Sequence, residues 1–106
     1  MSKDDVYAPY NILIDKSLTP IAKVVLVDLL NEEAENGKSH FTNKEIAKKF
    51  GYSTSSISNA IRLLKNKGLI SIELINKNFR TISTKKDLLE ETIAARKEKQ
   101  NDEDER

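Results

Sequence analysis

The side chains in this sequence that could do chemistry form hydrogen bonds or carry positive charge, and they gather in one stretch. Between Ser53 and Lys67 the chain holds hydroxyls, amides and basic groups, and it has no carboxylate. Such side chains can donate hydrogen bonds to phosphate oxygens and can read the edges of base pairs. This stretch therefore points to recognition of a polyanion rather than to a reaction.

The residue sets that reactions need are absent from the sequence. His40 is the only histidine, there is no cysteine, and no glycine-rich phosphate loop, apolar pair of acids or cluster of metal ligands is present. We therefore expect no enzyme, no metal site, no cofactor and no small-molecule ligand. No apolar run approaches the roughly 20 residues of a membrane span. The polar start at Met1–Tyr10 is unlike a signal segment, so we expect a soluble cytoplasmic protein.

The charged residues are distributed unevenly along the chain, although the net charge over 106 residues is only +1. Residues 1–37 carry three basic and seven acidic side chains, residues 38–86 eleven basic and two acidic, and residues 87–106 four basic and eight acidic. The middle region thus has a net charge of +9 between flanks of −4 each. A basic module of this kind favours a polyanionic partner, and a well-solvated surface is the alternative explanation.

The elements that must position this module begin with a buried helix. Thr19 suits the N-cap and Pro20 suits the first helical position. The apolar residues that follow occupy nearly all sides of the helix, so we expect a central buried helix that is closed by Gly37. Before it, the alternation around Ile12–Ile14 favours a short strand, which follows a flexible lead over residues 1–9.

Two further helices are predicted, joined by a tight turn. Thr42 and Glu45 have the spacing of a capping box, and the helix that they open stops at Gly51. Ser53 can cap the next helix, which is expected over Thr54–Lys67. Along that helix an apolar stripe recurs at i, i+3, i+4 and i+7 and should face the core. The stripe consists of Ile57, Ala60, Ile61 and Leu64.

The spacing between these two helices carries a resemblance. Ala47 lies where one helix must cross the other, and Gly51, four residues on, supplies a backbone angle that most residues resist. Three residues of the apolar stripe then follow on the packing side of the second helix. Over Asn43–Arg62 this pattern is similar to the helix-turn-helix of phage repressors. The resemblance implies that the second helix lies in the major groove of duplex DNA, with its N-terminal residues toward the bases.

In that placement the outer face of the second helix would contact DNA. Asn59 could pair with adenine through two hydrogen bonds, and Arg62 could reach guanine or a phosphate. The hydroxyl groups could donate to phosphates or bases, and for the serines a capped and solvated helix start is an equally good explanation. Together with one lysine of the first helix, the expected contacts are Lys44, Ser53, Thr54, Ser55, Ser58, Asn59 and Arg62.

A β-hairpin is predicted after these helices. Leu69–Ile75 alternates between apolar and polar residues, Asn76-Lys77-Asn78 suits a three-residue turn because Asn tolerates left-handed backbone angles, and Phe79–Ser83 returns. The passage Ile57–Ile70 is similar to the helix-to-wing step of bacterial winged-helix regulators. This resemblance implies a basic wing at residues 69–83. Its expected contacts with phosphates or a minor groove are Lys77, Asn78 and Arg80, and a solvated hairpin is the alternative.

A longer stretch, about Tyr10–Ile82, resembles the winged-helix domains of plasmid and phage replication initiators from low-GC Gram-positive bacteria. The resemblance is carried by Leu18–Leu26, Thr42–Ala47 and Gly51–Ser53. Such initiators usually carry a further domain, whereas one helix and a tail follow the wing here. The resemblance therefore implies a stand-alone accessory or regulatory factor of a mobile element, acting in transcription, replication, partition or conjugative transfer.

We thus predict a mainly α fold with a small β-hairpin, namely a winged helix-turn-helix with an added C-terminal helix. The predicted winged-helix domain spans residues 10–84, the C-terminal helix residues 85–100, and a disordered acidic tail residues 101–106. The expected function is sequence-specific binding of double-stranded DNA. The alternative is a winged helix that binds another protein without reading DNA.

The C-terminal helix carries a short apolar stripe that needs a partner. Leu88, Leu89, Thr92 and Ile93 lie at i, i+1, i+4 and i+5, and a helix of this length is marginal alone in water. Because paired half-sites usually provide specificity, we expect a homodimer formed through Leu88, Leu89 and Ile93. Packing of the same stripe against the chain's own central helix, or against the Ile12–Ile14 segment, is the alternative.

Overall fold

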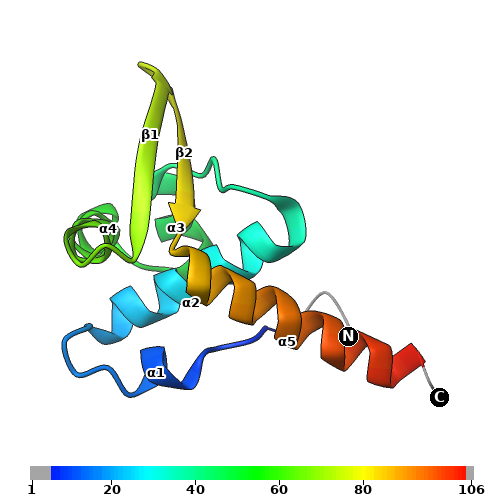
Figure 1. Ribbon diagram of the computed structural model, residues 1–106. Helices are drawn as coiled ribbons and strands as arrows, with labels where there is room; N and C mark the ends of the chain where they lie inside the picture. The colour runs from blue at the N-terminus through cyan, green and yellow to red at the C-terminus, as the bar shows by residue number, and fades with distance from the viewer. Residues whose placement is uncertain (1–5, 105–106) are drawn as a thin grey trace.

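The computed structural model describes the backbone of residues 6–104 and the side chains as far as residue 98. Within that part of the chain, five helices and a two-stranded antiparallel sheet form a winged helix with an added C-terminal helix (Figure 1). The predicted fold class is therefore confirmed. In chain order the elements are α1 (Tyr10–Leu13), α2 (Pro20–Asn36), α3 (Asn43–Phe50), α4 (Thr54–Asn66), β1 (Ile70–Asn76), β2 (Phe79–Thr84) and α5 (Lys86–Asp104).

Helix α2 is the centre of the fold, as predicted. Thr19 Oγ1 accepts a hydrogen bond from the backbone N–H of Ala22 at 3.2 Å, and Pro20 occupies the first helical position. Gly37 closes the helix with a φ of 90°. The helix packs against α4, α5 and β2, so it contributes to every layer of the core. Its buried apolar residues are Ala22, Val25, Leu26, Leu29 and Leu30.

The strand predicted at Ile12–Ile14 is wrong, because this segment is the short helix α1. The backbone N–H of Ile12 donates to the carbonyl of Pro9 at 3.0 Å, and that of Ile14 donates to Tyr10 at 3.1 Å. A lone strand would need a neighbour, whereas a helical turn closes its own hydrogen bonds and still buries Ile12. In the expected flexible lead, Pro9 is buried, so packing begins before α1; residues 1–5 lie outside the described residues.

Helices α3 and α4 form the predicted pair. Thr42 Oγ1 accepts from the Glu45 N–H while Glu45 Oε1 accepts from the Thr42 N–H, which completes the capping box. Gly51 ends α3 in the left-handed region with a φ of 73°, where a side chain would be strained. The predicted apolar stripe of α4 is buried throughout and packs with Ile46 and Ala47 of α3 in one core.

Strands β1 and β2 pair in antiparallel register from Ile70–Thr84 outward, and the hairpin stands away from the helices (Figure 1). A backbone bridge between Ser39 and Ile82 fastens its base. The predicted turn differs in detail: Asn76 belongs to β1, the register shifts between Leu74 and Asn76, and only residues 77–78 connect the strands. No non-glycine residue described here has a positive φ. Asn76 instead stabilises the turn by accepting the Asn78 N–H at 2.9 Å.

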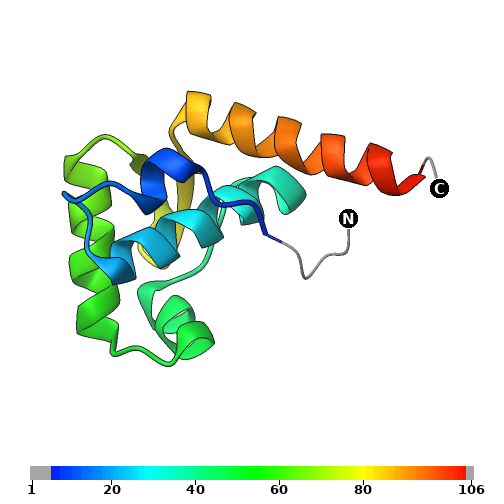
Figure 2. The same ribbon diagram turned by 90° about the horizontal axis from the view of Figure 1, so that it is seen from below.

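Helix α5 packs along α2 and then runs beyond the body of the molecule (Figure 2). It begins at Lys86, close to the predicted start, and reaches Asp104. The predicted disordered tail is therefore helical over residues 101–104, because those residues continue a helix that is already nucleated. Residues 105–106 lie outside the described residues.

Candidate nucleic-acid interface

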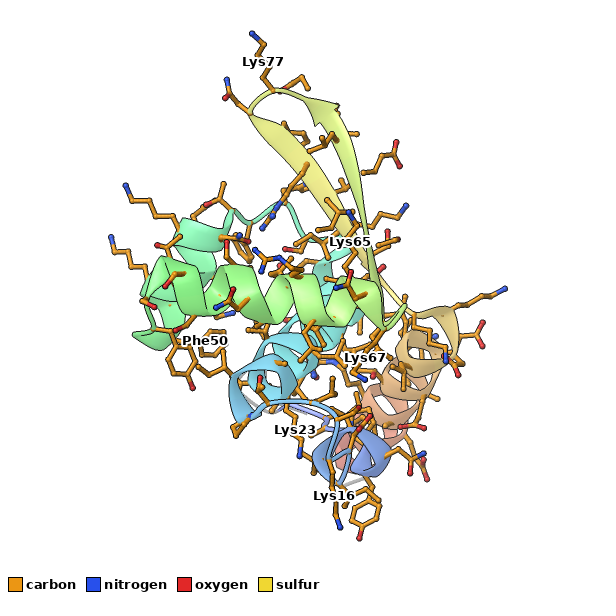
Figure 3. The ribbon with its side chains drawn as sticks, turned by 90° about the vertical axis from the view of Figure 1, so that its left-hand side faces the viewer. Lys16, Lys23, Phe50, Lys65, Lys67 and Lys77 are labelled. Atoms are coloured by element: carbon orange, nitrogen blue, oxygen red, sulfur yellow. The ribbon has the colours of Figure 1, made fainter. Side chains whose placement is uncertain are left out.

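The outer face of α4 is polar and basic and faces the viewer in Figure 3, with the hairpin standing above it. Because the apolar stripe fixes the rotation of the helix, the residues on the side opposite the stripe must point to solvent. Thr54, Ser55, Asn59 and Arg62 are all exposed, as predicted from the sequence. No residue of α4 is acidic. This face therefore presents donors and positive charge without a repelling carboxylate of its own.

The exposed amide and guanidinium groups of this face are neighbours. Arg62 Nη1 donates to Asn59 Oδ1 at 3.4 Å, which is a long hydrogen bond that a better acceptor can displace. Exposed Lys65 extends the face at the C-terminal end of α4 on the side of the hairpin, whereas Lys67, which follows the helix, is labelled on the other side in Figure 3. Asn66 is exposed in the same last turn. The face thus continues past Arg62 toward the base of the hairpin.

All three predicted serine contacts have partners within the chain, and the partner of Ser55 is Ser53 Oγ at 3.4 Å. Ser53 Oγ is the N-cap of α4, since it accepts the Ser56 N–H at 3.1 Å and bonds to Ser56 Oγ at 2.8 Å. This geometry matches the capping explanation for Ser53. Ser58 is half-buried at the side of the outer face, and its Oγ accepts from Asn43 Nδ2 at 3.1 Å. Ser58 therefore bridges α4 to the first residue of α3.

The wing and the start of α3 border an open hollow of about 420 Å³. Lys77 and Asn78 line it from the tip of the hairpin, and Lys44 lines it from α3. All three are exposed. Lys77 stands at the far end of the hairpin (Figure 3). Positive charge from two separate elements therefore meets across one concave surface, which is an arrangement suited to a phosphate backbone.

Arg80, an expected DNA contact, also lines this hollow, and hydrogen bonds within the chain hold its guanidinium. The residue is half-buried, and its guanidinium donates to the Phe41 carbonyl through Nε at 3.2 Å and through Nη2 at 2.9 Å. Nη2 also donates to Asn43 Oδ1 at 2.7 Å. Burial lowers the pKa of the Arg80 guanidinium below its ordinary value, yet arginine stays charged in proteins. Sequence pattern could not reveal this role, because an arginine on a wing has the same signature whether it faces inward or outward.

The residues predicted to join two copies are used within the chain. Leu88 and Leu89 are half-buried and pack against the core, and Thr92 is fully buried with its Oγ1 donating to the Leu88 carbonyl at 2.8 Å. Ile93 is half-buried as well. Because α5 packs on α2, this arrangement is the alternative that the sequence left open, and the stripe is not a free surface.

Asn43 was not among the predicted contacts, although it connects the parts of this surface. It is the first residue of α3 and bonds to both Arg80 and Ser58. Its only sequence signal was its place directly after the Thr42 cap. His40 likewise stacks on Phe79 of the wing, with ring centroids 4.7 Å apart. The contacts of Asn43 with Arg80 and of His40 with Phe79 join segments almost 40 residues apart, and that of Asn43 with Ser58 joins residues 15 positions apart, so local patterns cannot reveal them.

Two negative findings concern the described residues alone. They contain no group of three or more His, Cys, Asp or Glu residues that could hold a metal ion. Among them, no helix combines the length and apolar character that crossing a membrane requires.

Comparison with known proteins gives one match. A family model described as a helix-turn-helix domain matches residues 15–70, which is more than half of the chain. The matched range runs from the end of the α1 region through α4 to the first residue of β1, so it contains the α3–α4 pair and leaves most of the wing and all of α5 outside. No curated protein and no solved structure matches the chain.

Proposed function

We propose that this chain, which belongs to the helix-turn-helix domain family, binds double-stranded DNA in a sequence-specific manner. The observation that carries the proposal is the outer face of α4, which is polar, basic and free of acidic residues. It lies beside a hairpin whose tip carries Lys77. A major groove about 12 Å wide admits a helix, and the wing would then lie against the neighbouring backbone.

Each group in the interface has a role in this proposal. Asn59 pairs with adenine through its amide, and Arg62 binds guanine or a phosphate; either contact replaces the long bond between them. Lys44 and Lys77 bind phosphates from opposite sides of the hollow. Arg80 forms no ion pair with the described residues, so its charge adds to the positive potential of the same hollow. In this proposal, α4 reads the bases and the wing positions the protein on the DNA backbone.

The proposed biological role is that of an accessory or regulatory factor of a plasmid, phage or other mobile element, active in the cytoplasm. The support is the sequence similarity to winged-helix domains of replication initiators between Tyr10 and Ile82. A small DNA-binding domain of this kind would mark a site for transcription, replication, partition or transfer. A homodimer on paired half-sites remains part of the proposal, although its contacts must lie outside the buried part of α5.

A salt titration tests DNA binding directly. With about 4–6 phosphates contacted, log K for a random duplex should fall with log salt at a slope near −4 to −5. Selection from a random duplex library should then enrich one sequence family. An absence of duplex binding at low salt, or a slope near zero, would refute the proposal.

The second candidate is a protein-binding module, and one observation favours it. An apolar groove is lined by Val6, Leu13, Val24 and Phe50, among others, and none of its lining residues belongs to α4. A protein partner in this groove would leave the face of α4 unused. This candidate predicts no duplex binding at low salt, so the same titration separates the two functions.

A further inference from the structure

A chain of three hydrogen-bonded side chains connects the wing to the outer face of α4. Arg80 on β2 donates through Nη2 to Asn43 Oδ1 at 2.7 Å, and Asn43 Nδ2 donates to Ser58 Oγ at 3.1 Å. The three residues come from β2, α3 and α4. All three are half-buried, so these bonds are better shielded from water than surface contacts are.

The chemistry of the three groups fixes the direction of every bond in this chain. A guanidinium has only donors, so the atom of Asn43 that faces Arg80 must be the carbonyl oxygen. The amide nitrogen then faces Ser58, and because this NH₂ group only donates, Ser58 Oγ must accept. The orientation of the Asn43 amide therefore follows from its contact with Arg80.

This direction leaves the hydroxyl hydrogen of Ser58 available. None of the described residues accepts a hydrogen bond from it, and Ser58 lies at the side of the outer face of α4. Resting on the proposed function, we propose that Arg80 and Asn43 are positioning residues that make Ser58 a hydrogen-bond donor toward DNA. Ser58 therefore offers its hydroxyl hydrogen to an acceptor atom, either a phosphate oxygen or an acceptor on a base edge.

One substitution reverses the direction of the hydrogen bond between residue 43 and Ser58 with almost no change in the shape of side chain 43. Asn43→Asp keeps an oxygen toward Arg80 but places a second oxygen toward Ser58. The Ser58 hydroxyl must then donate inward, and only its lone pairs remain for DNA. The carboxylate also repels DNA on its own account, so this part of the effect must be measured separately. Ser58→Ala supplies that measurement, because the repulsion persists there while the hydroxyl is gone.

The experiment is a double-mutant cycle on the full chain bound to its selected duplex. We expect the loss of affinity caused by Asn43→Asp to be at least about threefold larger in the chain with Ser58 than in the Ser58→Ala variant. The thermal midpoint of Asn43→Asp should not fall, because the hydrogen bond from Arg80 is kept and becomes an ion pair. Equal losses in the two backgrounds would overturn the inference, while an absence of duplex binding by the unmodified chain would overturn the proposed function with it.

A second variant and modified DNA keep the test independent of one substitution. Arg80→Lys retains the charge but cannot hold Phe41 and Asn43 with a planar fork. The Asn43 amide is then free to turn, so Ser58→Ala should cost less affinity in the Arg80→Lys variant than in the unmodified chain. Single methylphosphonate or 7-deazapurine substitutions across the duplex then identify the acceptor. One such position should weaken binding of the unmodified chain and have no effect on Ser58→Ala; if no position behaves in this way, Ser58 is not a donor to DNA.

Discussion

Tyr7 and Asn31 are joined by two hydrogen bonds that imitate the pairing of adjacent strands. The backbone N–H of Tyr7 donates to Asn31 Oδ1 at 2.9 Å, and Asn31 Nδ2 donates to the Tyr7 carbonyl at 2.8 Å. Asn31 is buried on α2, and its Oδ1 also accepts from Arg96 Nη1 of α5 at 2.8 Å. One amide therefore connects the N-terminal segment, the central helix and the C-terminal helix.

Replacement of this amide should destabilise the fold. Asn31→Ala leaves the Tyr7 backbone groups without their partner, and we expect the free energy of unfolding to fall by about 2 kcal/mol. Chemical denaturation measures this change. Asn36→Ala is the matched control, because Asn36 lies on the same helix but is exposed, and among the described residues its side chain bonds to Glu32 alone. Equal stability of the two variants would show that the amide is dispensable.

Substitutions on α4 should reduce the preference for the selected sequence, whereas substitutions on the wing should reduce the affinity for every duplex. Asn59→Ala should weaken binding to the selected duplex by about 1–3 kcal/mol and binding to random duplex much less, because it removes a base contact. Lys77→Ala should weaken both by similar factors and reduce the salt slope by about 1. Competition binding on the two duplexes measures both variants. The assignment fails if Lys77→Ala abolishes the sequence preference and Asn59→Ala preserves it.

The apolar stripe of α5 should contribute to the free energy of unfolding. Leu89→Asp places a charge where the side chain packs against the core, and we expect a loss of about 2 kcal/mol in stability. Glu90→Ala, at the exposed neighbouring position, serves as the control. Thermal unfolding and sedimentation distinguish the two roles of the stripe. A Leu89→Asp variant with an unchanged melting temperature and a halved mass would instead restore the dimer interface expected from the sequence.

The pKa of the Asp15 carboxyl should report on the hydrogen bonds in the loop before α2. Hydrogen bonds from the Ser17 hydroxyl and backbone N–H, at 2.6 and 2.8 Å, hold the pKa of the Asp15 carboxyl below its ordinary value. A group whose pKa is lowered by folding stabilises the fold above its ordinary pKa, and this contribution is lost as the pH falls. Ser17→Ala should raise the pKa of Asp15 part of the way back, as measured by NMR titration of the carboxyl carbon. An unchanged pKa would locate the cause elsewhere.

Local sequence patterns predicted the helical framework well. Thr42 with Glu45, Ser53, Gly51 and the stripe of α4 all act within a few residues of where they stand, and each is confirmed. The segment at Ile12–Ile14 was mistaken for a strand because a three-residue alternation also fits one turn of helix. Only the absence of a neighbouring strand decides between them, and that is a property of the whole fold.

The sequence predicted the exposed side chains of the candidate interface but not the half-buried hydrogen bonds beside them. Exposure of Asn59 and Arg62 follows from the helical period alone, whereas the inward turn of Arg80 depends on the Phe41 carbonyl 39 residues away. Asn43 was missed for the same reason, since both of its partners lie beyond α3. Long-range hydrogen bonds therefore account for the roles that local sequence patterns did not reveal at this surface.

The wing is anchored to the core only at its base, and this determines which of its residues can change without loss of stability. Ile70 and Ile82 are buried near the base, whereas Leu74 is 75% exposed and Lys77, at the tip, is exposed as well. Mutations in the outer half of the hairpin therefore cost the fold little free energy. The sequence of that half can therefore change with little effect on the fold, while the backbone hydrogen bonds between Ser39 and Ile82 and those from Arg80 to Phe41 and Asn43 preserve the direction of the hairpin.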